Sequence, residues 1–440
     1  MEGAAVKSAG NAVLRIRINS DFLCDAALLL YFCVLFGHQQ ENMTDMLLRY
    51  GSLAFLTGTH FFLCPCFKNA KGNPVFRMGK FELWMIILWL YGAASSFWSI
   101  DASNAYGVLW NLLKTMLACF MIRPRLNSRR RIDRVLALLL AALVYMLLLL
   151  VVRTPASAWG TERIGEVIGQ HSNEIGRLAS LGALLSFYFM TRKNKISVSY
   201  AIPFMAFIMT GFMTGSKNAI LIIIFQLAAY WILISKSWIK IFEIAFVAVG
   251  CVFIYWLIMN NQMLYQLVGI RVERMLNLFI SGENVDGSTS ERLYFIRTAW
   301  QLFKAHPVFG IGMNNFSAYL ASIGYSNPVY SHCGFLELLS TLGIPGFCVY
   351  YSMHFRIAAG LCRPALKRDK MAAVLLALCL RVLLFDVSTI SMYTYNMYIT
   401  LMIAYCFMLK KEEKNGLHAE TAAKKEGKRC GDGQCTDSCI

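Results

Sequence analysis

Long apolar runs separated by short polar segments are the dominant pattern along this 440-residue chain. A helix needs about 20 predominantly apolar residues to cross the hydrocarbon core of a bilayer. Runs close to this length recur throughout the chain and predict twelve membrane-spanning helices. They lie at residues 21–38, 51–67, 81–99, 105–122, 133–152, 174–191, 196–214, 218–235, 239–260, 333–354, 371–389 and 392–409. The pattern therefore predicts an all-α, multi-pass membrane protein.

The charge distribution supports a membrane protein and fixes its expected orientation. Only 15% of the residues are charged, whereas a soluble domain has roughly 25%. The net charge of +17 would suit a nucleic-acid partner, but the basic residues are distributed unevenly. With both termini in the cytoplasm, thirty of the 42 Lys and Arg residues lie on the inner side and nine on the outer side. This is the positive-inside bias of the cytoplasmic membrane, so no nucleic acid is expected.

Three parts are predicted along the chain. Residues 1–20 form a cytoplasmic segment, residues 21–409 form the transmembrane domain, and residues 410–440 form a basic, disordered cytoplasmic tail. No cleavable signal peptide is expected, because no small-residue cleavage site follows the first apolar run. The tail has three cysteines within residues 430–439 but no histidine at zinc-type spacing. We therefore expect no metal and no cofactor.

One predicted outer loop, residues 261–332, is much longer than the others. Connections of this length in compact proteins are usually functional. Within this loop, residues 289–305 have helical periodicity and predict a short amphipathic helix against the outer face of the bundle. Its apolar stripe consists of Leu293, Ile296, Trp300 and Phe303.

Ionisable residues on the outer side are the candidates for chemistry, because cations are scarce there. Arg163, Lys217 and Arg292 come from three different loops and could converge over one cavity. Cations together with a histidine suit an anionic ligand such as a phosphate or pyrophosphate. The complete set of polar candidates is Arg163, His171, Asn173, Ser216, Lys217, Arg292, Asn314, Asn315, His332 and Asp386.

Simpler interpretations exist for these residues. An outer arginine can be solvated or can face lipid headgroups, and a histidine at a helix mouth can be an interfacial polar residue. Arg381 and Asp386 lie in the same predicted span and could neutralise one another. Ionisable residues within spans are nevertheless costly, which favours functional hypotheses for them.

His332 stands directly before the predicted tenth span, which is interrupted by Gly343-Ile-Pro-Gly346. A proline within a helix removes a hydrogen bond and kinks the helix, while glycines allow neighbouring chains to approach closely. The sequence therefore predicts a kinked scaffold beneath a titratable ring.

Several segments, taken in order, resemble the motifs of a known family. They are SSFWSIDASNA (95–105), TGSKNA (214–219), SERLYFIRTAWQLFKAHPVFGIGMNNF (290–316) and the spacing from His332 to Gly343-x-x-Gly346. Together they resemble the bacterial O-antigen ligase and O-antigen polymerase family over about residues 80–400. Lys217 stands where arginine is usual in that family, and Cys333 replaces its usual polar residue.

The resemblance implies a membrane glycosyltransferase with a GT-C-type architecture and a long outer loop between helices 9 and 10. Such proteins use a glycan carried on undecaprenyl pyrophosphate at the outer face of the cytoplasmic membrane. A polymerase transfers it to another lipid-linked glycan, and a ligase transfers it to a lipid, wall or protein acceptor. We expect a metal-independent polymerase of a surface polysaccharide such as a capsule, and the ligase is the first alternative.

The resemblance also implies partners and roles. Besides membrane lipids, a flippase or chain-length regulator is an expected partner. His332 would act as general base, since a histidine pKa near 6.5 suits this task, and cations would stabilise the leaving pyrophosphate. The predicted catalytic residues are His332 and Arg292, and the predicted structural motif is Gly343 and Gly346. The predicted substrate-binding residues are Lys217 and Asp386, from the resemblance, and Arg163 and Asn173, from their expected outer position.

A transporter of an anionic solute is the second alternative, from a different functional class. Transporters place charged residues on broken helices near the bilayer midplane. Most candidates here lie at the outer ends of predicted spans, and the long outer loop 261–332 better suits a glycan acceptor site. The sequence therefore favours an enzyme.

Overall fold

The computed structural model describes most of the predicted transmembrane domain. The described residues are 20–64, 78–155, 164–193, 197–235, 252, 255–262, 265–269, 273 and 287–412. Within these ranges the chain forms helices and no strands. The ninth predicted span, Arg163 and the cysteines of residues 430–439 lie largely or wholly outside the described residues. Helices occupy the other eleven predicted segments.

The helices follow the apolar runs closely. In the first half of the chain they are α1 (Ser20–Gly37), α2 (Met43–Leu63), α3 (Lys80–Ala94), α4 (Ser103–Ile122), α5 (Arg129–Arg153), α6 (Ser172–Thr191), α7 (Ala201–Met213) and α8 (Lys217–Ile234). In the second half they are α12 (Gly287–Ala305), α13 (Phe316–Ser322), α14 (Gly334–Leu366), α15 (Lys370–Phe385) and a final helix over residues 395–412. Short 3₁₀ or π turns occur at Ser95–Phe97, Arg123–Arg125, Glu166–Ile168, Val198–Tyr200 and Tyr265–Gly269.

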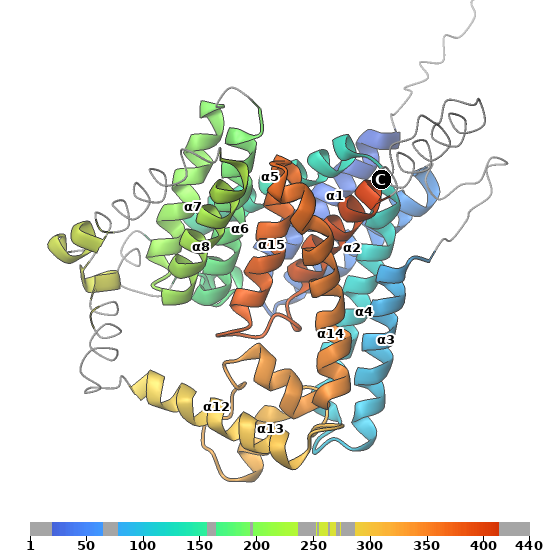
Figure 1. Cartoon of the computed structure of the whole chain (residues 1–440), viewed down its shortest axis with the longest axis vertical. Coiled ribbons are helices and arrows are strands. Elements are labelled where there is room, and N and C mark those ends of the chain that lie inside the picture. Colours follow the sequence, from blue (N-terminus) through green and yellow to red (C-terminus); the bar gives the residue numbers. More distant parts are fainter. Residues whose placement is uncertain are drawn as a thin grey trace, which may run out of the picture.

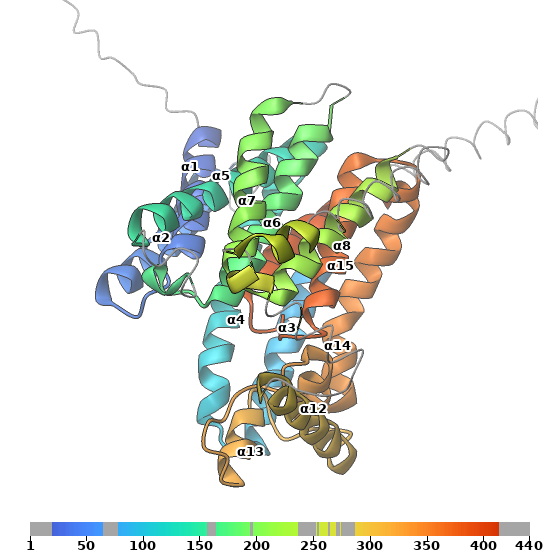
Figure 2. The same cartoon turned by 90° about the vertical axis from the view of Figure 1, so that its left-hand side faces the viewer.

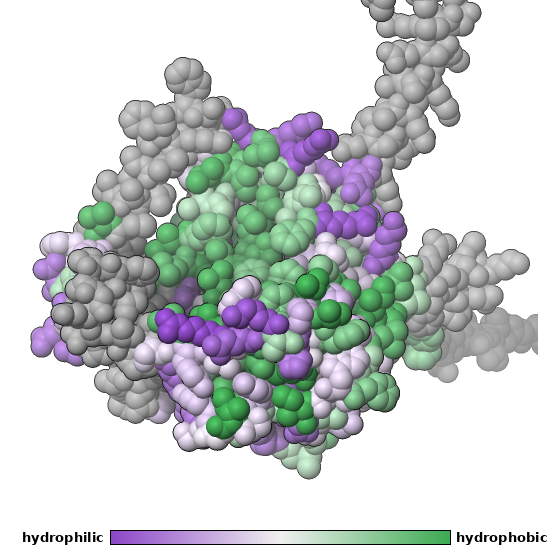
Figure 3. Space-filling model, turned by 60° about the horizontal axis from the view of Figure 1, so that its bottom comes forward, coloured by the Kyte–Doolittle hydropathy of each residue, from purple (hydrophilic) through white to green (hydrophobic). Residues whose placement is uncertain are grey.

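Most of these helices form one bundle, and α12 and α13 form a cap at one end of it. Figure 1 shows α12 and α13 below the bundle, beside the lower ends of α3, α4 and α14, and Figure 2 shows the same arrangement from the side. Hydrophobic side chains form a broad surface on the bundle in Figure 3, and hydrophilic side chains gather at the cap. We refer below to residues 287–332 as the outer cap, after the orientation that the charge distribution predicts.

Four described helical segments are long and apolar enough to cross a membrane. They are Ser20–Gly37, Ser103–Arg125, Arg129–Arg153 and Gly334–Leu366. These helices indicate a multi-pass membrane protein. The number of twelve spans and the orientation remain predictions.

Small residues allow α6 to occupy the centre of the bundle. A methyl group added at Gly182 would lie 2.5 Å from the Phe207 ring of α7, and one at Gly176 would lie 2.6 Å from Ala219 of α8. Almost every side chain of α6 is buried as a result. Close approach through small residues is a common way of packing helices in membranes. It also brings the start of α8 beside the first turns of α6.

The predicted tenth span is not one continuous helix. Gly343 has φ 65° and ψ −169°, which divides α14 into a first part, residues 334–342, and a second part, residues 344–366. The second part extends well beyond the predicted end at residue 354. The sequence predicted the interruption, but not that the residues before it form a separate short helix.

The predicted helix at 289–305 exists as α12 (Gly287–Ala305), but the prediction of which of its faces packs on the protein was wrong. The side chains of Phe295, Ala299 and Leu302 are buried against α13 and its flanking loops. Leu293 and Trp300, which belong to the predicted stripe, are 43% and 47% exposed. Apolar residues occur at helical spacing on two faces of α12, and periodicity alone cannot decide which face packs on protein.

The predicted orientation is tested by labelling from outside the cell. Ser326 is exposed in the outer cap, and Ser128 caps the start of α5 at the opposite, basic end of the bundle. In a cysteine-free background, we expect an impermeant thiol reagent to label Ser326→Cys in intact cells. Ser128→Cys should be labelled only after the cells are opened. The reverse pattern would contradict both the orientation and the outer position of the candidate site.

Candidate functional site

The kink in α14 is a docking site for the outer cap. Pro345 has no N–H, so the Thr341 carbonyl lacks its helical donor. That carbonyl accepts instead from Gly312 N at 2.9 Å, and Ile344 N donates to Pro307 O at 3.0 Å. A methyl group at Gly343 would lie 2.0 Å from the Val308 carbonyl oxygen, so only glycine fits. The predicted close approach at this motif is therefore made by the backbone of the cap.

Two asparagines join the cap to the α3–α4 loop and to the first turn of α4. The buried Asn315 accepts from Asp101 N at 2.7 Å through its side-chain oxygen, and Asn314 donates to the Asn104 carbonyl at 2.9 Å. Asn314 has a φ of 58°, a left-handed conformation that asparagine tolerates better than most residues. These hydrogen bonds give both asparagines a structural role. They hold residues 312–316 in place beside α12.

This scaffold places α12 against the segment that carries His332. The His332 ring lies 5.9 Å from the Phe295 ring of α12, nearly parallel to it, and 4.2 Å from the Tyr330 ring. Arg292 precedes Phe295 by one turn and acts electrostatically on His332. The structure therefore brings together the two residues that the sequence predicted to be catalytic.

His332 has a strained backbone that is held from both sides. Its φ is 57°, a left-handed conformation that is uncommon for residues with a side chain. On one side, the buried Glu337 carboxylate accepts from Ser331 N at 2.8 Å. On the other side, Gly334 N donates to the Asp386 backbone carbonyl at 2.7 Å. These two anchors fix the position of the ring.

Asp386 is fully buried and its carboxylate already has protein donors. It accepts from Ser391 N at 2.7 Å, Ser391 Oγ at 2.5 Å and the Tyr351 hydroxyl at 2.9 Å. A methyl group at Gly334 would lie 2.3 Å from Asp386 Oδ1. This environment favours a role in positioning the His332 segment over the predicted direct contact with substrate.

The suggested pairing of Arg381 with Asp386 does not occur. Arg381 donates to Ser180 Oγ at 3.0 Å and to the Arg177 carbonyl at 2.6 Å, and it stacks on Phe385. The donors to the Asp386 carboxylate are those of Ser391 and Tyr351. Arg381 therefore joins α15 to α6.

Electrostatics connects His332 to Arg292, and its neighbour Tyr330 to Arg292 and Arg177. Burial, followed by the positive charge of Arg292, lowers the pKa of His332 from 6.5 to about 4, although Glu291 opposes this. The ring is therefore neutral at pH 7 and can accept a proton. Burial also raises the pKa of Tyr330, and this hydroxyl interacts with both Arg292 and Arg177. Tyr330 is thus close enough to interact electrostatically with the cation of the cap and with the cation of the bundle.

Arg177, like Glu337, is a residue that sequence reasoning missed. It is 4% exposed, donates to Thr394 Oγ1 at 2.9 Å and forms an ion pair with Glu174. Arg177, Glu174 and His171 line a cavity of about 330 Å³ at the start of α6, together with residues 393–396 at the beginning of the last helix. Arg177 was assigned to the interior of a span, yet a lone arginine in an apolar helix is itself a signal of function.

The remaining predicted residues have different outcomes. Lys217 is the first residue of α8, beside the first turns of α6, but its side chain lies outside the described residues. Ser216 caps this helix by accepting from Ala219 N. Asn173 lies in the first turn of α6, next to His171 on the cavity wall. In the described ranges no three His, Cys, Asp or Glu residues are grouped to bind a metal.

Known families provide an independent comparison with this geometry. Residues 201–351 match the O-antigen ligase family model. The match begins at α7 and ends within α14, so it includes the start of α8, all of α12, His332 and the kink. It confirms the resemblance on which the predicted roles of Arg292 and His332 depend. No curated protein matches the chain significantly.

Residues 201–351 therefore resemble the O-antigen ligase family, and the apolar helices indicate a membrane protein. The family implies lipid-linked glycans as substrates in general. Of the candidate residues, Lys217, Arg292 and His332 lie within the match, whereas Asn173, Arg177 and Asp386 lie outside it.

Proposed function

We propose that the protein is a membrane glycosyltransferase that polymerises glycan repeat units carried on undecaprenyl pyrophosphate. The observation that carries this proposal is the placement of His332 beside Arg292 within the segment that matches the O-antigen ligase family. A neutral imidazole next to fixed cations suits an attack by a hydroxyl on a sugar whose leaving group is an anion.

The proposed reaction has one bond-forming and one bond-breaking event. The hydroxyl oxygen of the acceptor glycan forms a bond to the anomeric carbon of the donor. The bond between that carbon and the pyrophosphate oxygen breaks, and the pyrophosphate leaves with the electron pair. His332 accepts the hydroxyl proton. Arg292, with Lys217 and Arg163 as further candidates, would stabilise the charge on the leaving group, so that no metal is required.

The protein holds this arrangement before substrate arrives. Glu337 and Asp386 fix the backbone on either side of His332, and the docked cap fixes α12. Groups held in place need little reorganisation in the transition state, which is where electrostatic catalysis gains most of its effect. When an anionic pyrophosphate binds beside Arg292, it offsets the positive charge that lowers the His332 pKa. The ring should then become a stronger base in the complex than in the free protein.

The alternative within the class is a ligase that transfers the finished glycan to a lipid, wall or protein acceptor. The two functions differ in what accumulates when the protein is lost. Loss of a polymerase leaves single repeat units on the acceptor, whereas loss of a ligase leaves long lipid-linked chains unattached.

The direct test uses the purified protein in detergent with lipid-linked repeat units as donor and acceptor. We expect a ladder of longer lipid-linked glycans, and we expect the ladder to persist in the presence of EDTA. Transfer only to a separate acceptor would favour the ligase. Loss of the ladder with EDTA would contradict the proposed metal-independent stabilisation of the leaving group.

A further inference from the structure

Two basic residues lie within the apolar helices α2 and α4, away from His332 and Arg292. Arg49 is six residues from the start of α2 and Lys114 is eleven residues from the start of α4, or about 9 Å and about 16 Å along the helices. Arg49 donates to the Gln40 carbonyl at 3.3 Å, and the Lys114 ammonium lies 5.1 Å from the centre of the Tyr50 ring. Among the described residues neither cation forms an ion pair with a carboxylate. Lys114 also interacts with the Tyr50 hydroxyl. Cations that lack a carboxylate partner at such positions are costly unless a ligand or function compensates for them.

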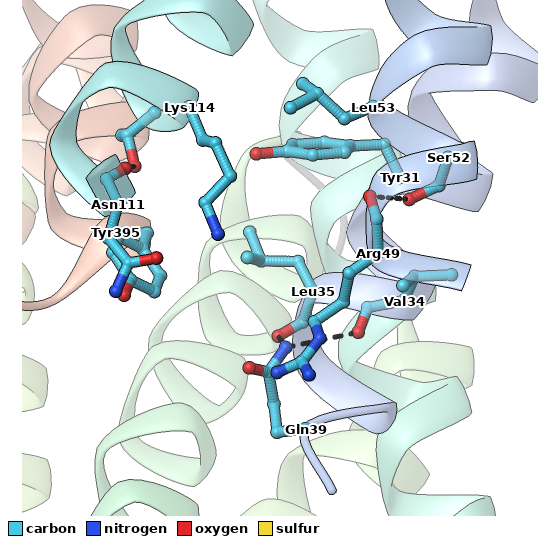
Figure 4. Close-up of a pocket in the computed structure, with 11 residues that line it drawn as sticks. Tyr31, Val34, Leu35, Gln39, Arg49, Ser52, Leu53, Asn111, Lys114 and Tyr395 are labelled. Carbon is cyan, nitrogen blue, oxygen red and sulfur yellow. Dashed lines mark hydrogen bonds between the residues drawn. The ribbon is translucent and has the colours of Figure 1, made fainter. Parts of the chain in front are cut away.

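Both cations point into one pocket. Figure 4 shows the Lys114 ammonium and the Arg49 guanidinium directed into the same space, with Asn111, Gln39 and Tyr395 on its wall. The pocket has a volume of about 140 Å³, whereas a water needs only about 10–15 Å³ measured in this way. It therefore has room for a phosphate group. An anion there would relieve the repulsion between the two cations.

An apolar groove continues from this pocket along the helices. It has a volume of about 850 Å³ and shares Leu53 and Lys114 with the pocket. Its walls come from α2, α3 and α4 and include Ala54, Ile86, Leu113, Met116, Leu117 and Phe120. Where the groove meets the pocket, Trp110 donates to the Tyr50 hydroxyl at 3.0 Å. Tryptophan and tyrosine side chains are typical of the membrane–water interface. A cationic end and an apolar groove together match an amphipathic molecule.

The pocket also opens toward the candidate site. Leu35, Gln39, Arg49 and Tyr395 line both this pocket and the cavity that contains Arg177. A headgroup held by Lys114 and Arg49 would therefore lie next to the cavity at the start of α6.

We propose that Lys114 and Arg49 bind the phosphate of a membrane lipid whose hydrocarbon chain occupies the groove between α2 and α4. This site is separate from His332 and Arg292. A free phosphate would satisfy the cations but would leave the adjoining apolar groove unused, so the occupant is a lipid phosphate. If the proposed function also holds, and only then, this site would hold the second lipid-linked chain of the polymerisation.

The test measures binding of farnesyl phosphate to the purified full chain in detergent by native mass spectrometry. We expect one bound molecule whose affinity falls by about tenfold in Lys114→Met and in Arg49→Met, because each variant loses one charge-assisted contact. Methionine keeps an unbranched apolar chain in the groove. Arg153→Met is the matched control, because Arg153 is exposed at the end of α5, and it should bind farnesyl phosphate like the wild type.

Four results would overturn the proposal. Wild-type affinity in both methionine variants, verified to be folded by their thermal melting, would remove the cations from the site. Equal binding of farnesol would mean that the phosphate is not recognised. Displacement by an equal concentration of inorganic phosphate would make this a free-anion site. A loss in Arg292→Ala as large as that in Lys114→Met would assign the binding to the His332 site. Inactivity of the protein as a polymerase would leave the expected binding unchanged, so the two proposals fail independently.

Discussion

Replacing His332 by asparagine or alanine is expected to lower turnover by roughly 10²- to 10⁴-fold, the usual contribution of a general base. The physical reason is the position of a neutral imidazole beside Arg292, at the end of a segment anchored by Glu337 and Asp386. Asparagine tolerates the left-handed backbone of this residue better than alanine does, so His332→Asn removes the base with less disturbance of the fold. The measurement is the rate of incorporation of lipid-linked repeat units by purified protein.

The matched control for His332 is His306, which is exposed at the other end of α12 in the same cap. His306→Ala should retain wild-type turnover and wild-type thermal melting. Normal turnover in both His332 variants would return this residue to the role of an interfacial polar group. Loss of turnover together with loss of folded protein in His332→Ala, but full activity in His332→Asn, would assign the residue a purely structural role.

The pH profile gives a second measurement of the same residue. A base must be unprotonated in the free enzyme for kcat/KM to be high. Because the pKa of His332 is lowered from 6.5 to about 4, kcat/KM should stay nearly constant as the pH falls from 7 to 6 and should decrease only as the pH approaches 4. A decrease of kcat/KM already near pH 6.5 would contradict the desolvation of the His332 ring that the structure indicates.

Much of the helical fold could be predicted because apolar runs of bilayer length report directly on helices. The interruption at Gly343 and Pro345 was also predictable, because both residues act through the backbone. The contacts that this interruption makes with the cap could not be predicted. The contacts of Gly343 with Val308 and of Thr341 with Gly312 join segments some thirty residues apart through a backbone path that local sequence does not encode.

The candidate site shows the same division between local and long-range information. His332 and Arg292 were identified from motif spacing, and the structure brings them together. Arg177 and Glu337 were missed because each lies within an apolar run and was assigned to a helix interior, although burial of an ionisable side chain is the feature that now makes each one informative. The buried face of α12 was wrong for a related reason, since membrane and protein surroundings both accept apolar side chains.

Replacing Arg292 by alanine is expected to lower kcat/KM by about 10²- to 10³-fold, equivalent to about 2–4 kcal/mol of transition-state stabilisation. Arg292→Lys should retain more activity than Arg292→Ala, because the charge is kept while the planar fork is lost. In the same alanine variant, the residual kcat/KM should begin to decrease at a higher pH than in the wild type. The sign follows from the charge: a neighbouring cation disfavours protonated His332, so removing it raises the His332 pKa.

Arg297 is the matched control for this prediction, because it lies five residues later on α12 and its side chain is exposed. Arg297→Ala removes the same charge and the same side chain from the same helix and should change neither kcat/KM nor the acidic limb. Equal losses in the two alanine variants would indicate a general effect of cap charge on an anionic substrate. Full activity of Arg292→Ala at matched protein levels would remove Arg292 from the site. A large loss of kcat/KM with an unshifted acidic limb would mean that Arg292 contacts the substrate but does not act electrostatically on His332. That result would contradict the close placement of the two residues on which the proposed reaction rests.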